Sequence, residues 1–230
     1  MKYVEITHLK EEIDELWAFI KLYSEEIDGE VLEQRDQEFY RFIAKQIVFF
    51  KKILITYPKS YFVRVLISDL YSLIINDIKK EKRYYYLNQR SIIENYIRMI
   101  VKNEENNSHI TRKSFLDLKE HNPIKESEYG KLMNEYKIAC SYIHGGEKMS
   151  EYLVTNFEES IKLSTTISQR QRKNQIYQFT DLINILNGLF LSNNYEDVDS
   201  AFHRSKVVLK YLMGNNYLEK LNEYKSNNKL

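Results

Sequence analysis

Glycine and proline are scarce in this sequence, and that scarcity constrains the fold more than any other feature. The 230 residues contain 6 Gly and 2 Pro, too few for the many tight turns of a β-sandwich or a β-barrel. Long stretches instead place apolar side chains three and four residues apart, which puts them on one face of an α-helix. A chain of this length can also bury a substantial core. The sequence therefore predicts an all-α fold, a multi-helix bundle in a single domain.

The chain begins with two long amphipathic segments joined by a short turn. Residues 3–27 end at Asp28 and Gly29, and residues 31–57 stop before Pro58, which predicts a helical hairpin over residues 1–58. A core follows at residues 59–170, and C-terminal helices at 171–230. Within these parts the apolar spacing predicts helices at residues 61–80, 84–103, 111–120, 126–144, 150–171, 174–191 and 198–213, with a fraying tail to Leu230.

The cysteine content and the apolar runs bear on the compartment. A single cysteine, Cys140, excludes an intramolecular disulfide and a Cys-rich metal site, and it fits a reducing environment. The first residues lack the apolar region of a signal peptide, and no apolar run is long enough to span a bilayer. We therefore expect a cytoplasmic protein with no membrane partner.

The charges are unevenly distributed along the chain. Residues 1–38 hold 4 basic and 12 acidic side chains, whereas residues 39–113 hold 15 basic and 6 acidic ones, a net charge of +9. The basic block could supply a field that attracts phosphate, and nucleic-acid binding without cleavage is one interpretation of it. Alternatively, the acidic and basic segments pack against each other or solvate helix faces. The acidic first arm of the hairpin also suits a protein partner.

One predicted helix delivers a histidine to its C-terminal end. His144 is followed at once by Gly145 and Gly146, and glycine commonly ends a helix because it enters the left-handed region without strain. Ser141 and Lys137 lie three and seven residues before His144, on the same face. A basic group, a hydroxyl and an imidazole are thus aligned, and we take Lys137, Ser141 and His144 as candidate catalytic residues of a phosphodiester site. The alternative is that His144 is a structural C-cap.

A second candidate lies in the predicted helix 84–103. Arg90, Glu94 and Arg98 are spaced four residues apart in a segment that is apolar around most of its circumference. Charges in such a place must be paired or serve a site. Glu94 could orient an arginine that binds an anionic substrate, or the three could form an i,i+4 ion-pair ladder between helices. The remaining histidines show no ligand spacing, so we expect neither a metal nor another cofactor.

At these two helices the chain resembles the HEPN superfamily, which comprises small all-α domains of prokaryotic toxin–antitoxin and abortive-infection systems. The mark of that family is an arginine, four to six residues, and then a histidine near a helix end. Here Lys137 stands six residues before His144, with lysine in the place of arginine. The segment Leu87–Glu94, followed by Ser141–Gly145, is also similar to helical families related to HEPN. The resemblance covers about residues 60–170.

The resemblance implies cleavage of RNA without a metal at a homodimer interface, in antiviral defence. His144 would assist attack by the ribose 2′-hydroxyl or protonate the leaving oxygen. Lys137 would stabilise the charge that develops on the phosphorus, with Arg90 or Arg98 as further anion-binding groups. The alternative is a non-catalytic interaction or regulatory module of such a system, in which Arg90, Glu94 and Arg98 are structural and the hairpin binds a protein.

Overall fold

A computed structural model of the chain describes residues 2–28, 32–58, 60–101, 110, 112–144 and 168–227. Within these residues all regular structure is helical, in ten helices, which confirms the all-α bundle. The helices are α1 (Lys2–Asp28), α2 (Gln34–Thr56), α3 (Tyr61–Ile78), α4 (Lys82–Ile100), α5 (Arg112–His121), α6 (Glu126–His144), α8 (Gln169–Asn193), α9 (Tyr195–Ala201), α10 (Lys206–Met213) and α11 (Asn215–Asn227).

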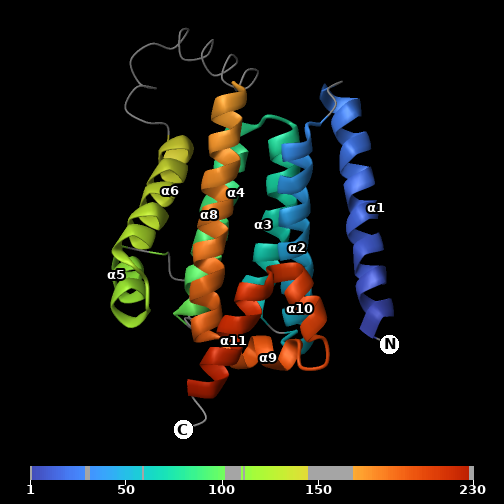
Figure 1. Ribbon diagram of the computed structural model, residues 1–230. Coiled ribbons are helices and arrows are strands. Elements are labelled where there is room, and N and C mark those ends of the chain that lie inside the picture. Colours follow the sequence, from blue (N-terminus) through green and yellow to red (C-terminus); the bar gives the residue numbers. More distant parts are fainter. Residues whose placement is uncertain are drawn as a thin grey trace.

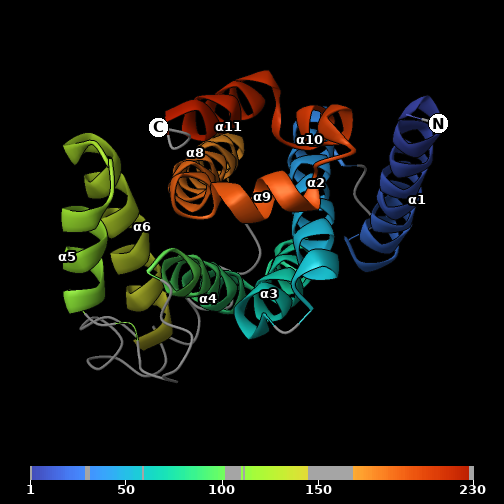
Figure 2. The ribbon, with the colours of Figure 1, turned by 90° about the horizontal axis from the view of Figure 1, so that it is seen from below.

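Four helices, α2, α3, α4 and α8, run side by side through the middle of the molecule (Figure 1). Helix α1 lies against α2 in the opposite direction, so the N-terminal hairpin is confirmed. Seen from below, α5 and α6 flank α4 on one side, while α9, α10 and α11 cross the end of the bundle (Figure 2). Helix α6 contacts both α4 and α8, and this position decides which residues surround its C-terminal end.

The core is one continuous apolar cluster that joins the hairpin to the C-terminal helices. At its centre the ring of Phe49 stacks on that of Phe202, with centroids 5.6 Å apart, and meets the edge of Phe190 at 6.3 Å. Phe50 packs edge-to-face on Tyr96 at 5.4 Å. Edge-to-face and offset pairs of buried aromatic rings each stabilise a fold beyond the area that they bury. Helices from the two ends of the sequence therefore depend on each other for their core.

A polar link crosses the same core between α2, α4 and α8. The side-chain amide of Asn187 donates to Gln46 Oε1 at 2.9 Å and accepts from the hydroxyl of Tyr96 at 2.8 Å. All three residues are buried. Burying an amide group costs free energy unless its hydrogen bonds are made. This link therefore stabilises one relative position of the three helices along their axes over shifted positions.

Three sequence predictions about helix boundaries are wrong. The break predicted after Gln171 is absent, because α8 begins at Gln169 and Ser168 and Gln171 form the capping box of its first turn. The helix predicted at 198–213 is two helices, α9 and α10, because the chain turns at 202–205 and so places Phe202 in the core. The tail is helical to Asn227, because Tyr217 and Leu221 are buried.

The helix predicted from Ser150 onward lies outside the described residues as far as 167. In the part of the chain that the structure does describe, no helix has the length and apolar character needed to cross a membrane.

Candidate functional site at the end of helix α6

Helix α6 ends at His144, as the sequence predicts. The side chain of His144 and the two glycines after it lie outside the described part of the structure. Lys137 and Ser141 are both exposed, and in a helix residues 137, 141 and 144 share one face. The Ser141 hydroxyl donates to the carbonyl oxygen of Ile138 at 2.7 Å. The structure thus exposes this face of α6 to solvent at Lys137 and Ser141.

A cation from α4 reaches the same helix end. Arg83 Nη2 donates to the carbonyl oxygen of Ile143, the residue before His144, at 3.1 Å. The ring of Tyr86, one turn further along α4, stacks on the ring of Tyr142, the residue before Ile143, with centroids 4.0 Å apart and planes 12° from parallel. Carbonyl groups at a helix C-terminus lack partners within the helix and carry partial negative charge. Arg83 satisfies one of them and places a guanidinium beside the His144 backbone.

Sequence reasoning missed Arg83 as a member of this site. The basic run Lys79–Arg83 suggests only a turn or a helix end with suitable charge, whereas Arg83 lies in the first turn of α4. At this position the charge of Arg83 destabilises α4, because cations are unfavourable near a helix N-terminus. The same charge stabilises the C-terminal end of α6. The signal that would have found Arg83 is the antiparallel register of α4 and α6, which depends on tertiary packing.

Glu94 is the centre of a ladder of charged groups between α4 and α6. Its Oε1 accepts from Arg90 Nε at 2.8 Å and from the hydroxyl of Tyr136 at 2.9 Å, and its Oε2 accepts from Arg98 Nη2 at 3.5 Å. The side chain of Glu94 is 15% exposed. The structure therefore contains the i,i+4 ladder, extended to α6 by Tyr136.

The electrostatics of the ladder favour its charged form. Burial opposes the charge on Arg90, but the hydrogen bond and the attraction from Glu94 outweigh burial and raise the pKa of the guanidinium. For the phenol of Tyr136, burial and then the charge of Glu94 both raise the pKa, so Tyr136 stays protonated and donates to the carboxylate. The guanidinium of Arg90 also lies over the Tyr136 ring, 5.8 Å from its centroid.

The ladder and the C-terminal end of α6 are separate places along the contact between α4 and α6. Glu94 lies against Tyr136, which precedes His144 by about 12 Å of helix rise. Arg98 is further away still, and its guanidinium lies over the ring of Phe62 of α3, 5.5 Å from the centroid. The structure thus brings Arg83 to the backbone just before His144 and places Lys137 and Ser141 on the exposed face of α6 one to two turns earlier, while Arg90, Glu94 and Arg98 lie along the contact between α4 and its neighbours.

Next to the ladder, α6 carries a buried carboxylate. Glu135 is 7% exposed and accepts from Gln89 Nε2 at 3.1 Å. Burial raises the pKa of Glu135 above its ordinary value. Within the described residues no cluster of three or more His, Cys, Asp and Glu side chains is placed to hold a metal ion.

Comparison with known proteins gives no match: no family model, no curated protein and no solved structure matches this chain.

Proposed function

We propose that this chain cleaves RNA by acid–base chemistry at the C-terminal end of α6, as a HEPN-like effector of a prokaryotic antiphage or toxin–antitoxin system. The observation that carries the proposal is the hydrogen bond from Arg83 to the carbonyl of Ile143. The HEPN pattern has an arginine where this chain has Lys137. Packing of α4 on α6 supplies a guanidinium at the same helix end, so the site holds the group that the motif alone lacks.

Each group has a role that its chemistry suits. The negative end of the α6 dipole favours the imidazolium form of His144, which suits a general acid that protonates the leaving oxygen. A guanidinium has five N–H donors in a planar fork that matches phosphate oxygens. Arg83 spends one donor on Ile143 and is exposed, so in this proposal it and Lys137 stabilise the charge that develops on the phosphate. A second copy of the chain would bring a second α6 end to the substrate.

The test measures cleavage of total RNA by purified wild-type protein and by His144→Ala, Lys137→Ala and Arg83→Ala. We expect defined fragments from the wild type. The cleavage rate of His144→Ala should be lower by at least about 100-fold, because a general acid or base usually contributes at least that much. His203→Ala and Lys113→Ala are matched controls at exposed positions outside the site, and both should cleave normally. Wild-type rates in His144→Ala protein with a native circular dichroism spectrum would refute the proposal.

A second candidate function is a non-catalytic interaction module that binds a protein through the hairpin. The observation that favours it is the outer face of α1, where Phe19 and Leu22 are 66% and 60% exposed among acidic residues. Large exposed apolar groups of this kind mark interaction surfaces when they cluster. A photocrosslinker at Phe19 should then trap one specific protein in cells, whereas the same group at Tyr177, also 67% exposed, should not. Intact RNA together with such an adduct would favour this function over cleavage.

A further inference from the structure

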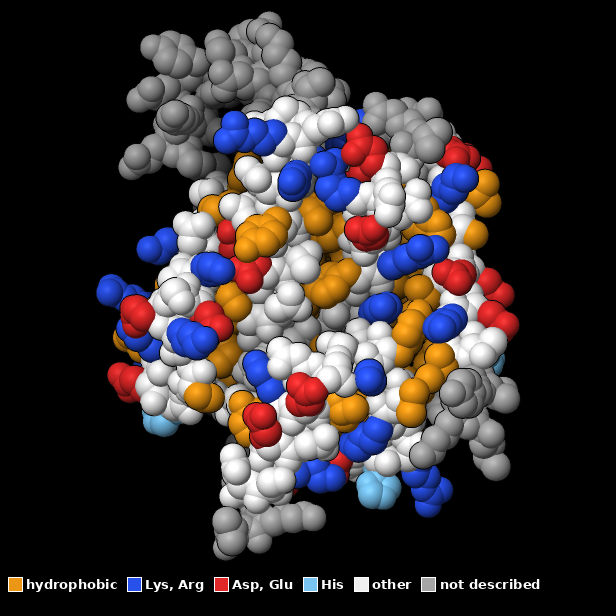
Figure 3. Space-filling model, in the orientation of Figure 1, with side chains coloured by type: hydrophobic (Ala, Val, Ile, Leu, Met, Phe, Trp, Pro, Cys, Tyr) orange, Lys and Arg blue, Asp and Glu red, His pale blue; other side chains and the backbone are white. Residues whose placement is uncertain are grey.

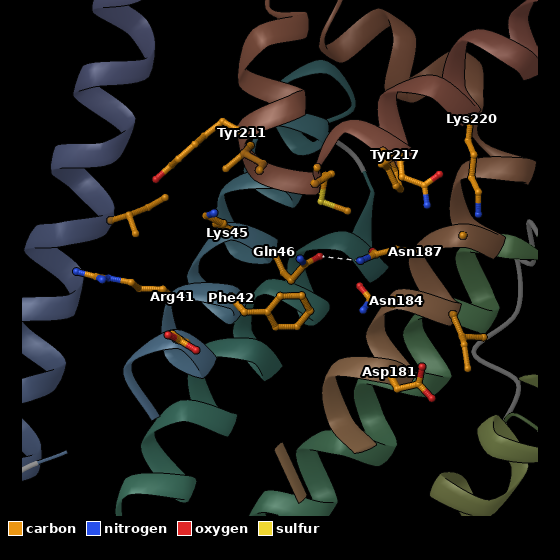
Figure 4. Close-up of a pocket in the computed structure, with 18 of the residues that line it drawn as sticks. Arg41, Phe42, Lys45, Gln46, Asp181, Asn184, Asn187, Tyr211, Tyr217 and Lys220 are labelled. Carbon is orange, nitrogen blue, oxygen red and sulfur yellow. Dashed lines mark hydrogen bonds between the residues drawn. The ribbon is translucent and has the colours of Figure 1, made fainter. Parts of the chain in front are cut away.

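A large cavity opens on the face of the molecule formed by α1, α2, α8, α10 and α11, with Glu128 from the first turn of α6 also in its lining, and it lies away from the C-terminal end of α6. Its volume is about 960 Å³, at the upper end of the range typical of small-molecule sites. The hollow is visible near the middle of the face shown in Figure 3, with Lys and Arg side chains around it. Figure 4 shows the residues that line it, with α2 on one side and α8 on the other. No motif or residue spacing in the sequence predicts this cavity.

The α1 and α2 side of the cavity is positively charged. Nζ of Lys45 and Nζ of Lys10 lie 4.6 and 5.5 Å from the centroid of the Tyr211 ring, and Arg41 is one helical turn from Lys45. Burial, and then the like charges of Arg41 and Lys10, lower the pKa of Lys45. Among the described residues neither lysine has a carboxylate partner, so the charges of Lys10 and Lys45 repel each other.

The carboxylates around the cavity already have partners. Asp14 pairs with Arg41 at 3.3 Å, and Asp181 pairs with Lys131 at 2.6 Å. Glu38 accepts from Gln34 at 3.0 Å, and Glu128 accepts from the backbone N–H of Lys125 at 3.1 Å. Asp14 and Asp181 are therefore paired with cations, whereas Glu38 and Glu128 accept only from neutral donors. Among the described residues that line the cavity, Lys10, Lys45 and Lys220 have no carboxylate partner, and an anion bound beside Lys10 and Lys45 would relieve their mutual repulsion.

Between the lysines and α8 the cavity offers amide groups from both α2 and α8 and a ring from α2. Gln46 Oε1 accepts from the side-chain amide of Asn187, while Gln46 Nε2 has no acceptor among the described residues. The amide of Asn184 lies beside them, and the ring of Phe42 points into the space between α2 and α8 (Figure 4). Amide groups present a donor and an acceptor side by side, which matches the hydrogen-bonding edge of a nucleobase, and an aromatic face can stack on the base.

Two further features indicate that the space is kept open. Gly188 lies within α8, where glycine costs about 0.5–1 kcal/mol relative to alanine, yet no atom lies within 4 Å of the place where its Cβ would be. Packing against neighbours therefore does not explain the glycine, whereas a wider cavity does. Tyr217 also lines the cavity, and its hydroxyl is buried without a hydrogen-bond partner among the described residues. A buried polar atom without a partner calls for a water or a ligand nearby.

We propose that this cavity binds a nucleoside phosphate, with the phosphate against Lys45 and Lys10 and the base against Phe42 and the amides of Gln46 and Asn184. The charge selects the anion, and the amide and aromatic wall selects the base. The site is distinct from the end of α6, and the proposal does not depend on RNA cleavage.

The test is isothermal titration calorimetry on the full-length protein with AMP, GMP, CMP and UMP, and with inorganic phosphate and adenosine as partial ligands. We expect saturable binding of at least one monophosphate. Inorganic phosphate alone and adenosine alone should bind at least about 10-fold more weakly, since each makes only part of the contacts. Lys45→Gln should weaken binding by about 10-fold or more, because it removes a charge-assisted contact to the phosphate. Lys173→Gln, at an exposed position of α8 outside the cavity, is the matched control and should bind normally.

Gly188→Leu fills the cavity from within α8. We expect it to abolish binding while the melting temperature stays at or above that of the wild type, because leucine is a better helix former than glycine and open space receives its side chain. The proposal is overturned if no monophosphate binds at about 1 mM, if inorganic phosphate binds as tightly as the best monophosphate, or if Lys45→Gln and Gly188→Leu both bind like the wild type.

Discussion

Arg172 is the residue whose loss should destabilise the fold most clearly. In the first turns of α8 its Nε donates to Asp36 Oδ1 at 2.8 Å, and its Nη1 and Nη2 donate to the two oxygens of Asp77 at 2.7 Å each. The hydroxyl of Tyr40 donates to Asp77 Oδ2 at 2.8 Å. Side-chain exposure is 16% for Arg172 and 4% for Asp77. This cluster joins α2, α3 and α8 at the end of the bundle where α8 begins.

The size of the effect follows from burial. Burial opposes the charge on Arg172, but the carboxylate of Asp77 outweighs it and raises the pKa of the guanidinium. Arg172→Met leaves Asp36 and Asp77 with no cation, and removing one partner of a buried pair costs about 3–5 kcal/mol. For a protein of this size each kcal/mol lowers the melting temperature by about 2–4 °C. We therefore expect a decrease of about 6–20 °C.

Thermal and urea unfolding of Arg172→Met, measured beside Arg170→Met, provides the assay. Arg170 is exposed two residues earlier on the same helix, so its substitution should change the free energy of unfolding by less than about 0.5 kcal/mol. Adding Asp77→Asn to Arg172→Met should restore part of the lost stability, because it removes an orphaned charge. If Arg172→Met unfolds within about 1 kcal/mol of the wild type, the cluster is not a buried ion pair and the reasoning fails.

Two other predictions concern buried polar groups. Burial raises the pKa of Glu135, so its charged form destabilises the fold at neutral pH. Glu135→Gln, which keeps an acceptor for Gln89, should raise the melting temperature at pH 7.5, and the gain should vanish as the pH falls below the ordinary value of 4.5, where the carboxyl is neutral in both states. An equal gain at all pH values would contradict this cause. Tyr96→Phe removes the donor to Asn187 Oδ1 and should lower the free energy of unfolding in urea by about 1–3 kcal/mol; no change would show that water or another donor replaces the phenol.

Features of the fold that depend on local pattern could be predicted from the sequence. Helices α1 and α6 have almost the predicted bounds, because apolar spacing defines each helix and glycine follows it. The turn at 202–205 could not be predicted, since it contains neither glycine nor proline, and Phe202 leaves the helix to stack on Phe49 from α2. The start of α8 is polar and resembles a linker in sequence. The partners that hold its Arg172 in place are Asp36 and Asp77, which lie 136 and 95 residues away, so the local sequence does not reveal them.

The candidate sites also divide into features that are local in the sequence and features that depend on tertiary packing. The ladder of Arg90, Glu94 and Arg98 is local, and its spacing of four residues is sufficient to predict an ion-pair ladder as one of two alternatives. The hydrogen bond from Arg83 to Ile143 spans 60 residues, and it requires knowledge of how α4 lies on α6. The cavity beside Lys45 is lined by residues from six helices, so periodicity within any one of them could not reveal it.

The hydrogen bonds of Asn187 have a consequence for synthesis of the chain on the ribosome. Its partners Tyr96 and Gln46 precede it by 91 and 141 residues, whereas α2, α3 and α4 are consecutive neighbours that can associate as soon as they emerge. We expect the nascent chain to form this three-helix unit first and to keep the apolar surface around Phe49 and Phe50 uncovered until α8 and the residues after it, which include Phe202, are complete. In that interval the surface is available to chaperones, and any pause in translation before α8 would prolong its exposure.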